Sequence, residues 1–467
     1  MNTYPGVGCD VDSHLYSFSF NPNPDWSQRF ADQPENIRYG TEVVNLSWIA
    51  SREVWQVQLR DVQSRHIFTR EAEIVVSCVG SISIPKDCNI PGHENYSGKI
   101  WHSARWNHDE MLKGKKVAIV GNGCSAAQLV PHVVRAADQV VQFQRSPQWI
   151  NERPNSPFTA TQKFCFRYMP LANRIYRFSI WKGTDALHKL YTSETQSAIK
   201  ARASATETAI AYMKHTAPAE YHEMLIPKFP LGCKRRIFDP GYLESLHSPN
   251  VELTTEPILE FTETGLRTSK RDIDFDAVIL STGFKIQDFL SPIEVVGRNG
   301  ITLNEHWKST GGAQAYKGTF VSGFPNFGII FGPNAFPAHN SVIYTNEVQV
   351  EYVIKALFKP LLKGSFSVLD VKEAAEHRDA TEVQTKLKSM VWNSGCSNWN
   401  LDASGRNTTN YHDETWKFWY RLWWPVWDDF DLSGGAGASL PWRPEWKILG
   451  TALAICAASM TTYLSVM

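Results

Sequence analysis

Hydrophobic and polar positions along this chain repeat with two different periods, which predict strands in some segments and helices in others. Apolar and polar residues alternate in three short segments, which predicts antiparallel strands at 42–44, 54–59 and 66–69. Continuous apolar runs are typical of strands that are buried on both faces, as in a parallel sheet, and they occur at 73–80, 115–121, 139–144 and 275–283.

Helical periodicity lies between two of these apolar runs. Apolar residues recur at helical spacing from 124 to 134, so the segment 115–144 predicts one β-α-β unit. Residues 151–225 carry helix-forming residues without a strand pattern, and we predict a helical insertion there. A further amphipathic helix is predicted at 347–358. The chain is therefore expected to be an α/β protein.

The charge balance and the cysteines narrow the classes of function. The 467 residues suffice for two or three domains, and 47 basic residues cancel 47 acidic ones. This balance argues against nucleic-acid binding, which needs a basic face. The eight cysteines form no Cys-x-x-Cys pair, so we predict buried thiols, no disulfide framework and no metal site. The first residues lack the pattern of a signal peptide, and we expect a cytoplasmic enzyme.

A glycine-rich turn follows the strand predicted at 115–121 and opens the next helix. Gly121 permits a tight turn, and Gly123 lets the backbone approach a pyrophosphate. Ala126 replaces the third glycine of the dinucleotide-binding fingerprint, and the helix N-terminus offers free N–H groups to phosphates. The predicted dinucleotide site consists of Gly121, Asn122, Gly123, Cys124, Ser125, Ala126 and Ala127.

The end of the following strand indicates which dinucleotide binds. Arg145 and Ser146 stand there, 22 and 23 residues after Gly123. An acidic residue at this place suits the ribose 2′-hydroxyl of NAD, whereas a cation suits the 2′-phosphate of NADP. We predict NADP(H). The alternative is an ordinary strand–loop–helix turn with an exposed arginine.

A second motif precedes the β-α-β unit. Gly98, His102 and Trp106 match the fingerprint Phe-x-Gly-x-x-x-His-x-x-x-Trp-Pro/Asp of the Baeyer–Villiger monooxygenases, with Tyr96 in place of Phe and Asn107 in place of Pro or Asp. On chemistry alone, such a histidine would indicate only a core or loop residue. Related flavin monooxygenases that oxygenate nitrogen generally lack the tryptophan, so Trp106 favours the resemblance to the Baeyer–Villiger family.

Further segments extend this resemblance over nearly the whole chain. They are 4–10, 227–235, 274–284, 332–334, 339–341, 396–399 and 405–407. The resemblance implies two Rossmann-like dinucleotide-binding domains with a helical insertion, and FAD and NADPH as cofactors. It also implies the reaction, in which one oxygen of O₂ is inserted beside the carbonyl group of a ketone to give an ester.

The resemblance assigns catalytic roles to two residues. Arg235 would be the catalytic group, because a guanidinium stays charged at any working pH and can stabilise negative charge on the oxidant and on the tetrahedral intermediate. Asp10 would hold Arg235 through a charge-assisted pair. The alternative is that 234–236 is a solvated basic turn.

The resemblance also assigns cofactor contacts. Asp10, Tyr16 and Val43 would contact FAD, with a core position as the alternative for Tyr16. Lys234, Arg145 and Ser146 would bind the NADP phosphate. Further NADP contacts are expected from Gly8, Cys9, Asp10 and Arg235. His102 is expected to be structural, linking the fingerprint loop to the domain interface, and not to act as a base.

Two positions depart from the family pattern. Gly8 stands where arginine is frequent, so one cationic contact to a cofactor is absent. The first Gly-x-Gly-x-x-Gly, which holds the ADP half of FAD in the family, should precede Tyr4, yet only three residues do. We therefore expect an FAD domain that is incomplete at its N-terminus, little or no FAD binding by this 467-residue form, and a longer natural enzyme.

Pattern and resemblance together divide the chain. The expected segments are the first part of the FAD domain at 1–108, the NADP domain at 109–285 with its insertion at 151–225, the second part of the FAD domain at 286–446, and a tail at 447–467. Residues 448–467 are uncharged and long enough to span a bilayer. They are expected to form either a C-terminal anchor at the cytosolic face of a membrane or a buried helix.

The expected substrate is a small-molecule ketone, together with O₂. The insertion and the aromatic C-terminal part favour a large apolar molecule, and the resemblance to fungal secondary-metabolism members points to a polyketide or terpenoid, such as a sterigmatocystin/aflatoxin-type intermediate. Two alternatives remain, a flavin monooxygenase that oxygenates nitrogen or sulfur and a truncated, non-catalytic NADP-binding remnant. No oligomeric state is predicted.

Overall fold

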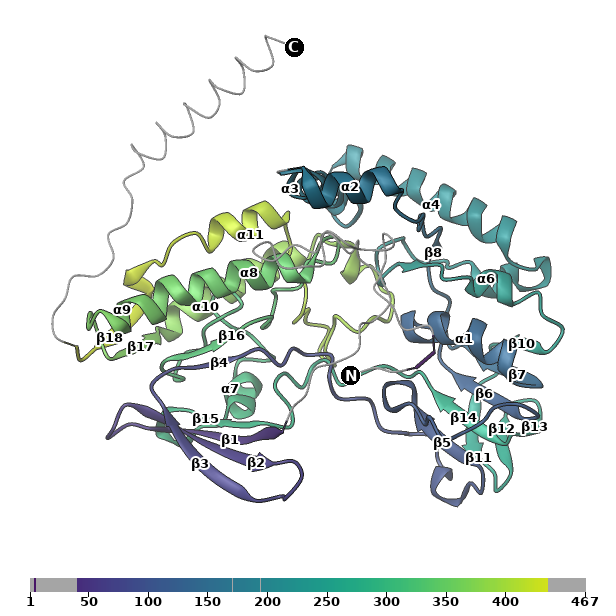
Figure 1. Ribbon diagram of the computed structural model, residues 1–467, viewed down its shortest axis with the longest axis horizontal. Helices are drawn as coiled ribbons and strands as arrows, with labels where there is room; N and C mark the ends of the chain where they lie inside the picture. The colour runs from purple at the N-terminus through teal and green to yellow at the C-terminus, as the bar shows by residue number, and fades with distance from the viewer. Residues whose placement is uncertain (1–3, 6–39, 170, 194, 436–467) are drawn as a thin grey trace, which may run out of the picture.

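The computed structural model describes residues 4–5, 40–169, 171–193 and 195–435 (Figure 1). The predictions for Gly8, Cys9, Asp10 and Tyr16 and for the tail at 448–467 lie outside these residues. Within the described ranges, no helix combines the length and the hydropathy that crossing a membrane would require.

A five-stranded parallel sheet forms the centre of one half of the molecule (Figure 1). Its strand order is β10-β7-β6-β14-β5, and the strands are Val251–Thr254, Gln139–Phe143, Lys116–Val120, Ala277–Leu280 and Lys99–His102. The apolar runs predicted from the sequence form β6, β7 and β14, because these three strands are the interior strands of the sheet and both of their faces are covered.

Two different layers cover this sheet. Val117, Ile119 and Ile279 point to the face where α1 (Cys124–Ala136) and α6 (Tyr242–Ser245) pack, whereas Ala118 and Val278 point to the other face. That other face is covered by an antiparallel sheet of β11 (Ile258–Phe261), β12 (Gly265–Thr268) and β13 (Asp272–Asp274). Because β5, β6 and β14 run parallel to one another, their carboxyl ends lie together at one edge of the sheet.

Helices fill the segment that the sequence predicts as an insertion. They lie in the chain between β8 (Ile150–Asn151) and β9 (Ile237–Phe238), two short strands that pair in parallel, and are α2 (Ala160–Tyr168), α3 (Ala172–Asp185), α4 (Gln196–Thr216) and α5 (His222–Leu225). Short 3₁₀ turns occur in this half at His93–Asn95, Ser103–Arg105, Ala186–Leu190 and Ala219–Tyr221. The helices of the insertion lie above the parallel sheet in Figure 1.

The other half begins with the predicted meander. β1 (Thr41–Ile49), β2 (Val54–Asp61) and β3 (Ile67–Ala72) are antiparallel, and β15 (Glu294–Val296) adds to β1 in parallel. The apolar run 73–80 yields only the short strand β4 (Val75–Ser77), whose partner in the described part of the chain is the parallel strand β16 (Phe327–Ile329). Val43 lies half-buried in β1 and packs against the core of this half.

Helices and loops complete the second half. They are α7 (Leu303–Ser309), α8 (Val342–Val353), a π-helical turn (Ile354–Phe358), α9 (Lys359–Leu362), α10 (Glu373–Leu387) and α11 (Thr415–Arg421), with the strand pair β17 (Val368–Val371) and β18 (Phe430–Ser433). Three 3₁₀ turns lie at Arg298–Gly300, Val391–Asn393 and Trp427–Asp429. The helix predicted at 347–358 therefore begins five residues earlier, where Ser341 caps α8 by accepting a hydrogen bond from the Tyr344 N–H.

The two halves are joined by a pair of chain crossings that run antiparallel to each other. Pro85 pairs with Phe284, the Lys86 N–H donates to the Gly283 carbonyl at 2.9 Å, and the Lys285 N–H donates to the Ile84 carbonyl at 2.8 Å. The connection is thus a short two-stranded ribbon at the carboxyl ends of β5 and β14.

The cysteines correct one expectation. Cys233 and Cys396 form a disulfide that closes a loop of 163 residues, so the prediction of unpaired thiols is wrong for these two. Both are almost completely buried. The sequence carried no signal of this pair, because residues so far apart approach each other only through the packing of the two halves.

Candidate functional site

The glycine-rich turn has the geometry that a dinucleotide needs. Gly121 has φ +122°, and a Cβ there would lie 2.4 Å from the Ser281 carbonyl oxygen of the neighbouring strand, so only glycine fits. Gly123 immediately precedes α1, and a Cβ there would have no heavy atom of the described residues within 4 Å. The free N–H groups at the N-terminus of α1 can bind phosphate oxygens.

A cationic corner lies beside this turn. Lys234 Nζ donates to Ser146 Oγ at 2.6 Å, although 88 residues separate them. Asn122 Nδ2 donates to the Ser146 carbonyl at 2.8 Å, which joins the glycine-rich turn to the same corner. Burial of the lysine and the charge of Arg145 lower the pKa of Lys234. The fold thus brings Arg145, Ser146 and Lys234 together, as the resemblance requires of a phosphate site.

Buried polar atoms at the edge of the sheets lack a protein partner. Ser77 Oγ at the end of β4, and Ser281 Oγ and Thr282 Oγ1 after β14, have no hydrogen-bond partner among the described residues. A polar atom is costly to bury without a partner, and ligands of parallel α/β sheets bind outside the carboxyl ends of the strands. These atoms therefore fit a polar cofactor at this edge. The position of Ser281 directly after a buried strand was the sequence signal that could have found it.

The fingerprint residues flank β5, with Gly98 directly before the strand, His102 at its end and Trp106 four residues later. A Cβ on Gly98 would lie 2.3 Å from the ring of Tyr96, whose hydroxyl donates to the Phe275 carbonyl at 2.7 Å. Glycine is thus needed because an aromatic ring packs directly over the backbone. Trp106 meets Trp101 edge-on at 5.7 Å between ring centroids, which fixes the loop after β5.

His102 ends β5 and is almost fully buried. Its Nδ1 accepts a hydrogen bond from the Ala104 N–H at 3.0 Å, and its ring meets Phe284 of the crossing ribbon at 5.7 Å. Burial lowers the pKa of His102, so the imidazole is neutral at pH 7. A neutral ring with its Nδ1 occupied by the backbone suits a structural role at the junction of the two halves.

Arg235 lies at the seam between the halves. Its guanidinium carbon is 5.7 Å from the ring centroid of Phe336, which belongs to the loop before α8. The backbone of Phe336 is held by the C-terminal segment, since its N–H donates to Thr409 and its carbonyl accepts from Tyr411. The Cys233–Cys396 disulfide links the loop that carries Arg235 to the C-terminal segment. The Arg235 side chain therefore extends from the half built on the parallel sheet towards Phe336 in the other half.

A buried carboxylate that sequence reasoning missed accepts hydrogen bonds from several residues where the two halves meet. Asp185, at the end of α3, accepts hydrogen bonds from His339 Nε2 at 3.1 Å, Asn340 Nδ2 at 3.1 Å and both the N–H and the hydroxyl of Thr415 at 2.8 and 2.6 Å. Burial alone would raise the pKa of Asp185, but the hydrogen bonds from His339 and Thr415 outweigh it and hold the pKa at about 2. An isolated Asp in a helical pattern gives no signal of such a role.

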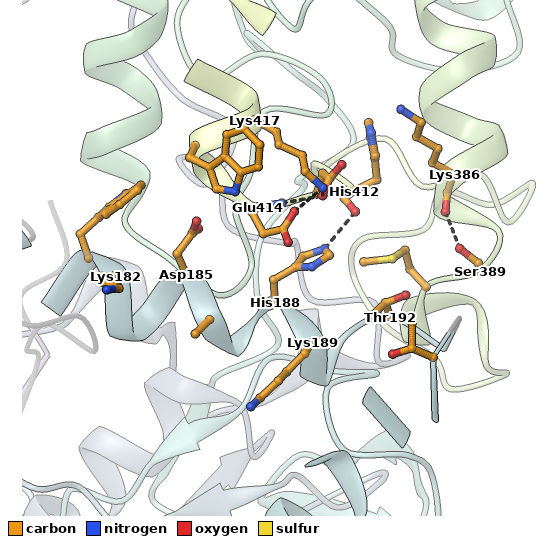
Figure 2. Close-up of a pocket in the computed structure, with 16 residues that line it drawn as sticks. Lys182, Asp185, His188, Lys189, Thr192, Lys386, Ser389, His412, Glu414 and Lys417 are labelled. Carbon is orange, nitrogen blue, oxygen red and sulfur yellow. Dashed lines mark hydrogen bonds and ion pairs between the residues drawn. The ribbon is translucent and has the colours of Figure 1, made fainter. Parts of the chain in front are cut away.

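A pocket of about 640 Å³ borders this carboxylate (Figure 2). It is lined by α3 and the turn after it on one side and by the segment around α10 and α11 on the other, and none of the predicted site residues lines it. His188, Asp413 and Glu414 could together hold a metal ion. However, Lys417 Nζ lies 2.7 Å from Asp413 and 2.6 Å from Glu414, so a cation already bridges both carboxylates. We assign no metal to them.

Comparisons with known proteins agree with this geometry. A family model described as flavin-binding monooxygenase-like matches residues 31–182. A Baeyer-Villiger monooxygenase of Pseudomonas aeruginosa is 35% identical over 441 residues, which covers 90% of this chain and 81% of the relative. The FAD-binding monooxygenase ktnD of Aspergillus niger is 30% identical over 467 residues, covering 94% of this chain and 76% of the relative.

A solved structure has the same fold. The structure of an oxidised steroid monooxygenase bound to NADP superposes with a TM-score of 0.78 at 25% sequence identity, covering 93% of this chain and 92% of that one.

Proposed function

The chain belongs to the Baeyer–Villiger monooxygenase family, and we propose that it binds NADPH at the corner of Arg145, Ser146 and Lys234 and uses Arg235 to promote oxygen insertion beside a ketone carbonyl. The resemblance drawn from the fingerprint is confirmed, as are the two-domain α/β flavoprotein fold and the flavin-dependent monooxygenase class. The cofactors are FAD and NADP(H). When bound, they supply the hydride and the activation of O₂.

The observation that carries the proposal is the approach of Lys234 to Ser146. Two cations, one of them buried, lie beside a serine hydroxyl and the N-terminus of α1. Such a group of donors binds a phosphate through charge-assisted hydrogen bonds. Burial and the charge of Arg145 lower the pKa of Lys234, and the negative charge of the phosphate would offset the repulsion between the two cations.

The position of Arg235 supports its proposed role. The residue lies two positions after the disulfide and faces the aromatic ring of Phe336, whose edge meets Trp399 at 5.4 Å between ring centroids. Arg235 is half-buried beside these rings, and a charge acts more strongly where less water surrounds it. The guanidinium can then donate hydrogen bonds to the carbonyl oxygen of the substrate as negative charge develops there.

We further propose that the substrate is a large apolar ketone. The 30% identity to a fungal FAD-binding monooxygenase supports a secondary metabolite, such as a polyketide of the sterigmatocystin/aflatoxin type. The structural match to a steroid monooxygenase supports a polycyclic ketone.

The test is the variant Arg235→Ala in FAD-reconstituted protein. We expect ester formation to fall by about 100-fold or more, as when one donor to a developing oxyanion is removed, while NADPH still reduces the flavin and oxygen uptake is diverted to hydrogen peroxide. The matched control is Arg236→Ala, which removes the neighbouring arginine of the same loop. The measurements are flavin absorbance in anaerobic stopped flow, hydrogen peroxide, and the products formed from a panel of cyclic and polycyclic ketones. An unchanged ester yield in Arg235→Ala would exclude this residue as the catalytic group.

A further inference from the structure

The outer side of the α2–α3 hairpin carries a stripe of exposed apolar side chains. Their exposed fractions range from 59% to 65%, and they are Phe164, Tyr168, Leu171, Ile175 and Phe178. Phe164 and Tyr168 are four residues apart on α2, and Ile175 and Phe178 are three apart on α3, with Leu171 directly before that helix. These spacings place the residues of each helix on one face. Most soluble surfaces do not expose so many large apolar residues together.

The packed side of the hairpin is formed mainly by other residues, although Phe178 also stacks on Trp181 at 5.6 Å between ring centroids. The inner side has its own aromatic cluster, in which Phe158, Phe166 and Tyr176 lie 5.0 to 6.0 Å apart between ring centroids. Ile180 of α3 is buried on the same inner side. The hairpin is thus apolar on two faces, one packed against the protein and one exposed.

The charged residues of the hairpin's own sequence have a single sign. From Arg153 to Thr184 the chain contains no acidic residue, although the whole chain has equal numbers of acidic and basic residues. The basic residues in this stretch are Arg153, Lys163, Arg167, Arg174, Arg177 and Lys182. Arg177 forms an ion pair with Glu347 at 3.5 Å. The side chains of Arg174 and Lys182 are exposed. In Figure 1 the hairpin lies at the periphery of the molecule.

We propose that the α2–α3 hairpin binds to the surface of an anionic lipid bilayer, with both helices in the plane of the membrane. Phe164, Tyr168, Leu171, Ile175 and Phe178 would enter the boundary between headgroups and acyl chains, and the neighbouring arginines and Lys182 would contact the lipid phosphates. A second copy of the chain is a poorer occupant, because a symmetric contact through this face would bring two sets of cations together. The inference depends neither on residues 448–467 nor on the proposed reaction.

The first test is flotation of the full chain with vesicles of phosphatidylcholine, with or without phosphatidylserine. We expect binding only to the vesicles that contain phosphatidylserine, and weaker binding at high salt. The double variant Ile175→Ser/Phe178→Ser should lower the partition coefficient by about tenfold or more, because two large apolar side chains no longer enter the membrane. The variants Arg174→Gln and Lys182→Gln should each lower it by about fivefold.

The matched control removes exposed apolar residues elsewhere. Ile67 and Leu259, on β3 and β11, are exposed to 50% and 53%, and Ile67→Ser/Leu259→Ser should leave the partition coefficient unchanged. If the control and Ile175→Ser/Phe178→Ser bind equally well, the hairpin is not the membrane contact.

A site-specific readout separates the hairpin from any other lipid contact of the chain. Phe178 is replaced by the photoreactive p-benzoylphenylalanine, and irradiation with vesicles that contain phosphatidylserine should give lipid adducts at this position. The same replacement of Ile67 should give none. Vesicle binding without adducts at position 178 would overturn the proposal. So would a dimer that forms without lipid and is lost in Ile175→Ser/Phe178→Ser, as measured by analytical ultracentrifugation.

Discussion

The half built on the parallel sheet and the half that contains residues 286–435 are held together in different ways. In the first, strands such as β6 and β14 bury only aliphatic side chains, and the backbone ladder satisfies their polar groups. In the second, buried polar side chains connect the loops. Glu376, which is 1% exposed, accepts hydrogen bonds from His306, Gln314 and the Ser322 N–H.

The two halves differ in the interactions that stabilise their folded structure. Burial of apolar strands is set by a local pattern that tolerates exchange of one aliphatic residue for another. A buried polar network holds only if every member keeps its partner, because each lost partner leaves a desolvated group. We therefore expect single polar substitutions in the second half, and at its contacts with the insertion, to have larger effects on stability than surface substitutions in the first.

The largest effect is expected for Asp185→Ala. Loss of this carboxylate leaves donors of His339, Asn340 and Thr415 without their acceptor. The free energy of unfolding should fall by about 3–5 kcal/mol, as measured by urea unfolding followed through tryptophan fluorescence. The matched variant Asp272→Ala removes an exposed carboxylate that pairs with Arg267 in the first half, and it should cost less than about 1 kcal/mol. Equal losses for the two variants would contradict the comparison.

The disulfide should contribute the next largest amount, because it joins the two halves. Cys233→Ser is expected to lower the free energy of unfolding by about 2–4 kcal/mol. Cys165→Ser, which removes a free and partly exposed cysteine of α2, serves as the control. Peptide mapping without reductant should recover the segments around Cys233 and Cys396 as one linked species. Recovery of both as free thiols would refute the link.

Arg145→Ala tests the proposed NADP phosphate site of the first half. The variant should weaken NADPH binding by about 10- to 150-fold, which corresponds to the loss of one charge-assisted contact, while NADH binding changes little. Isothermal titration with each coenzyme measures this directly. Arg70→Ala, which removes an exposed arginine of β3, is the control. A parallel loss for NADH and NADPH would show that Arg145 does not bind the 2′-phosphate.

The smallest effect is the dependence of stability on acid pH. The pKa of Asp185 is about 2 in the folded protein and about 3.9 in an unfolded chain. Its ionised form therefore stabilises the fold fully above about pH 4, and this contribution is lost as the pH falls from about 4 towards 2. By pH 3 the loss should be about 1 kcal/mol. In Asp185→Asn this component of the pH dependence should disappear, which paired unfolding curves of the two proteins would reveal.

The sequence alone determined the parts of this protein that depend on neighbouring residues. The apolar runs determined β6, β7 and β14, and the glycines at 121 and 123 marked the tight turn between β6 and α1. The fingerprint around His102 was sufficient to identify the family, because its residues lie in one short stretch of the chain around β5.

Contacts between distant segments were decided by the tertiary structure. The bond from Lys234 to Ser146, the Cys233–Cys396 disulfide and the donors around Asp185 each join residues at least 80 positions apart. No local pattern encodes such a contact, because the same side chains would be solvated if the intervening chain took another path. Lys234 and Ser146 meet within the first half, whereas the disulfide and the donors around Asp185 form where the two halves pack together. Burial then makes each polar side chain depend on the partner that it finds there.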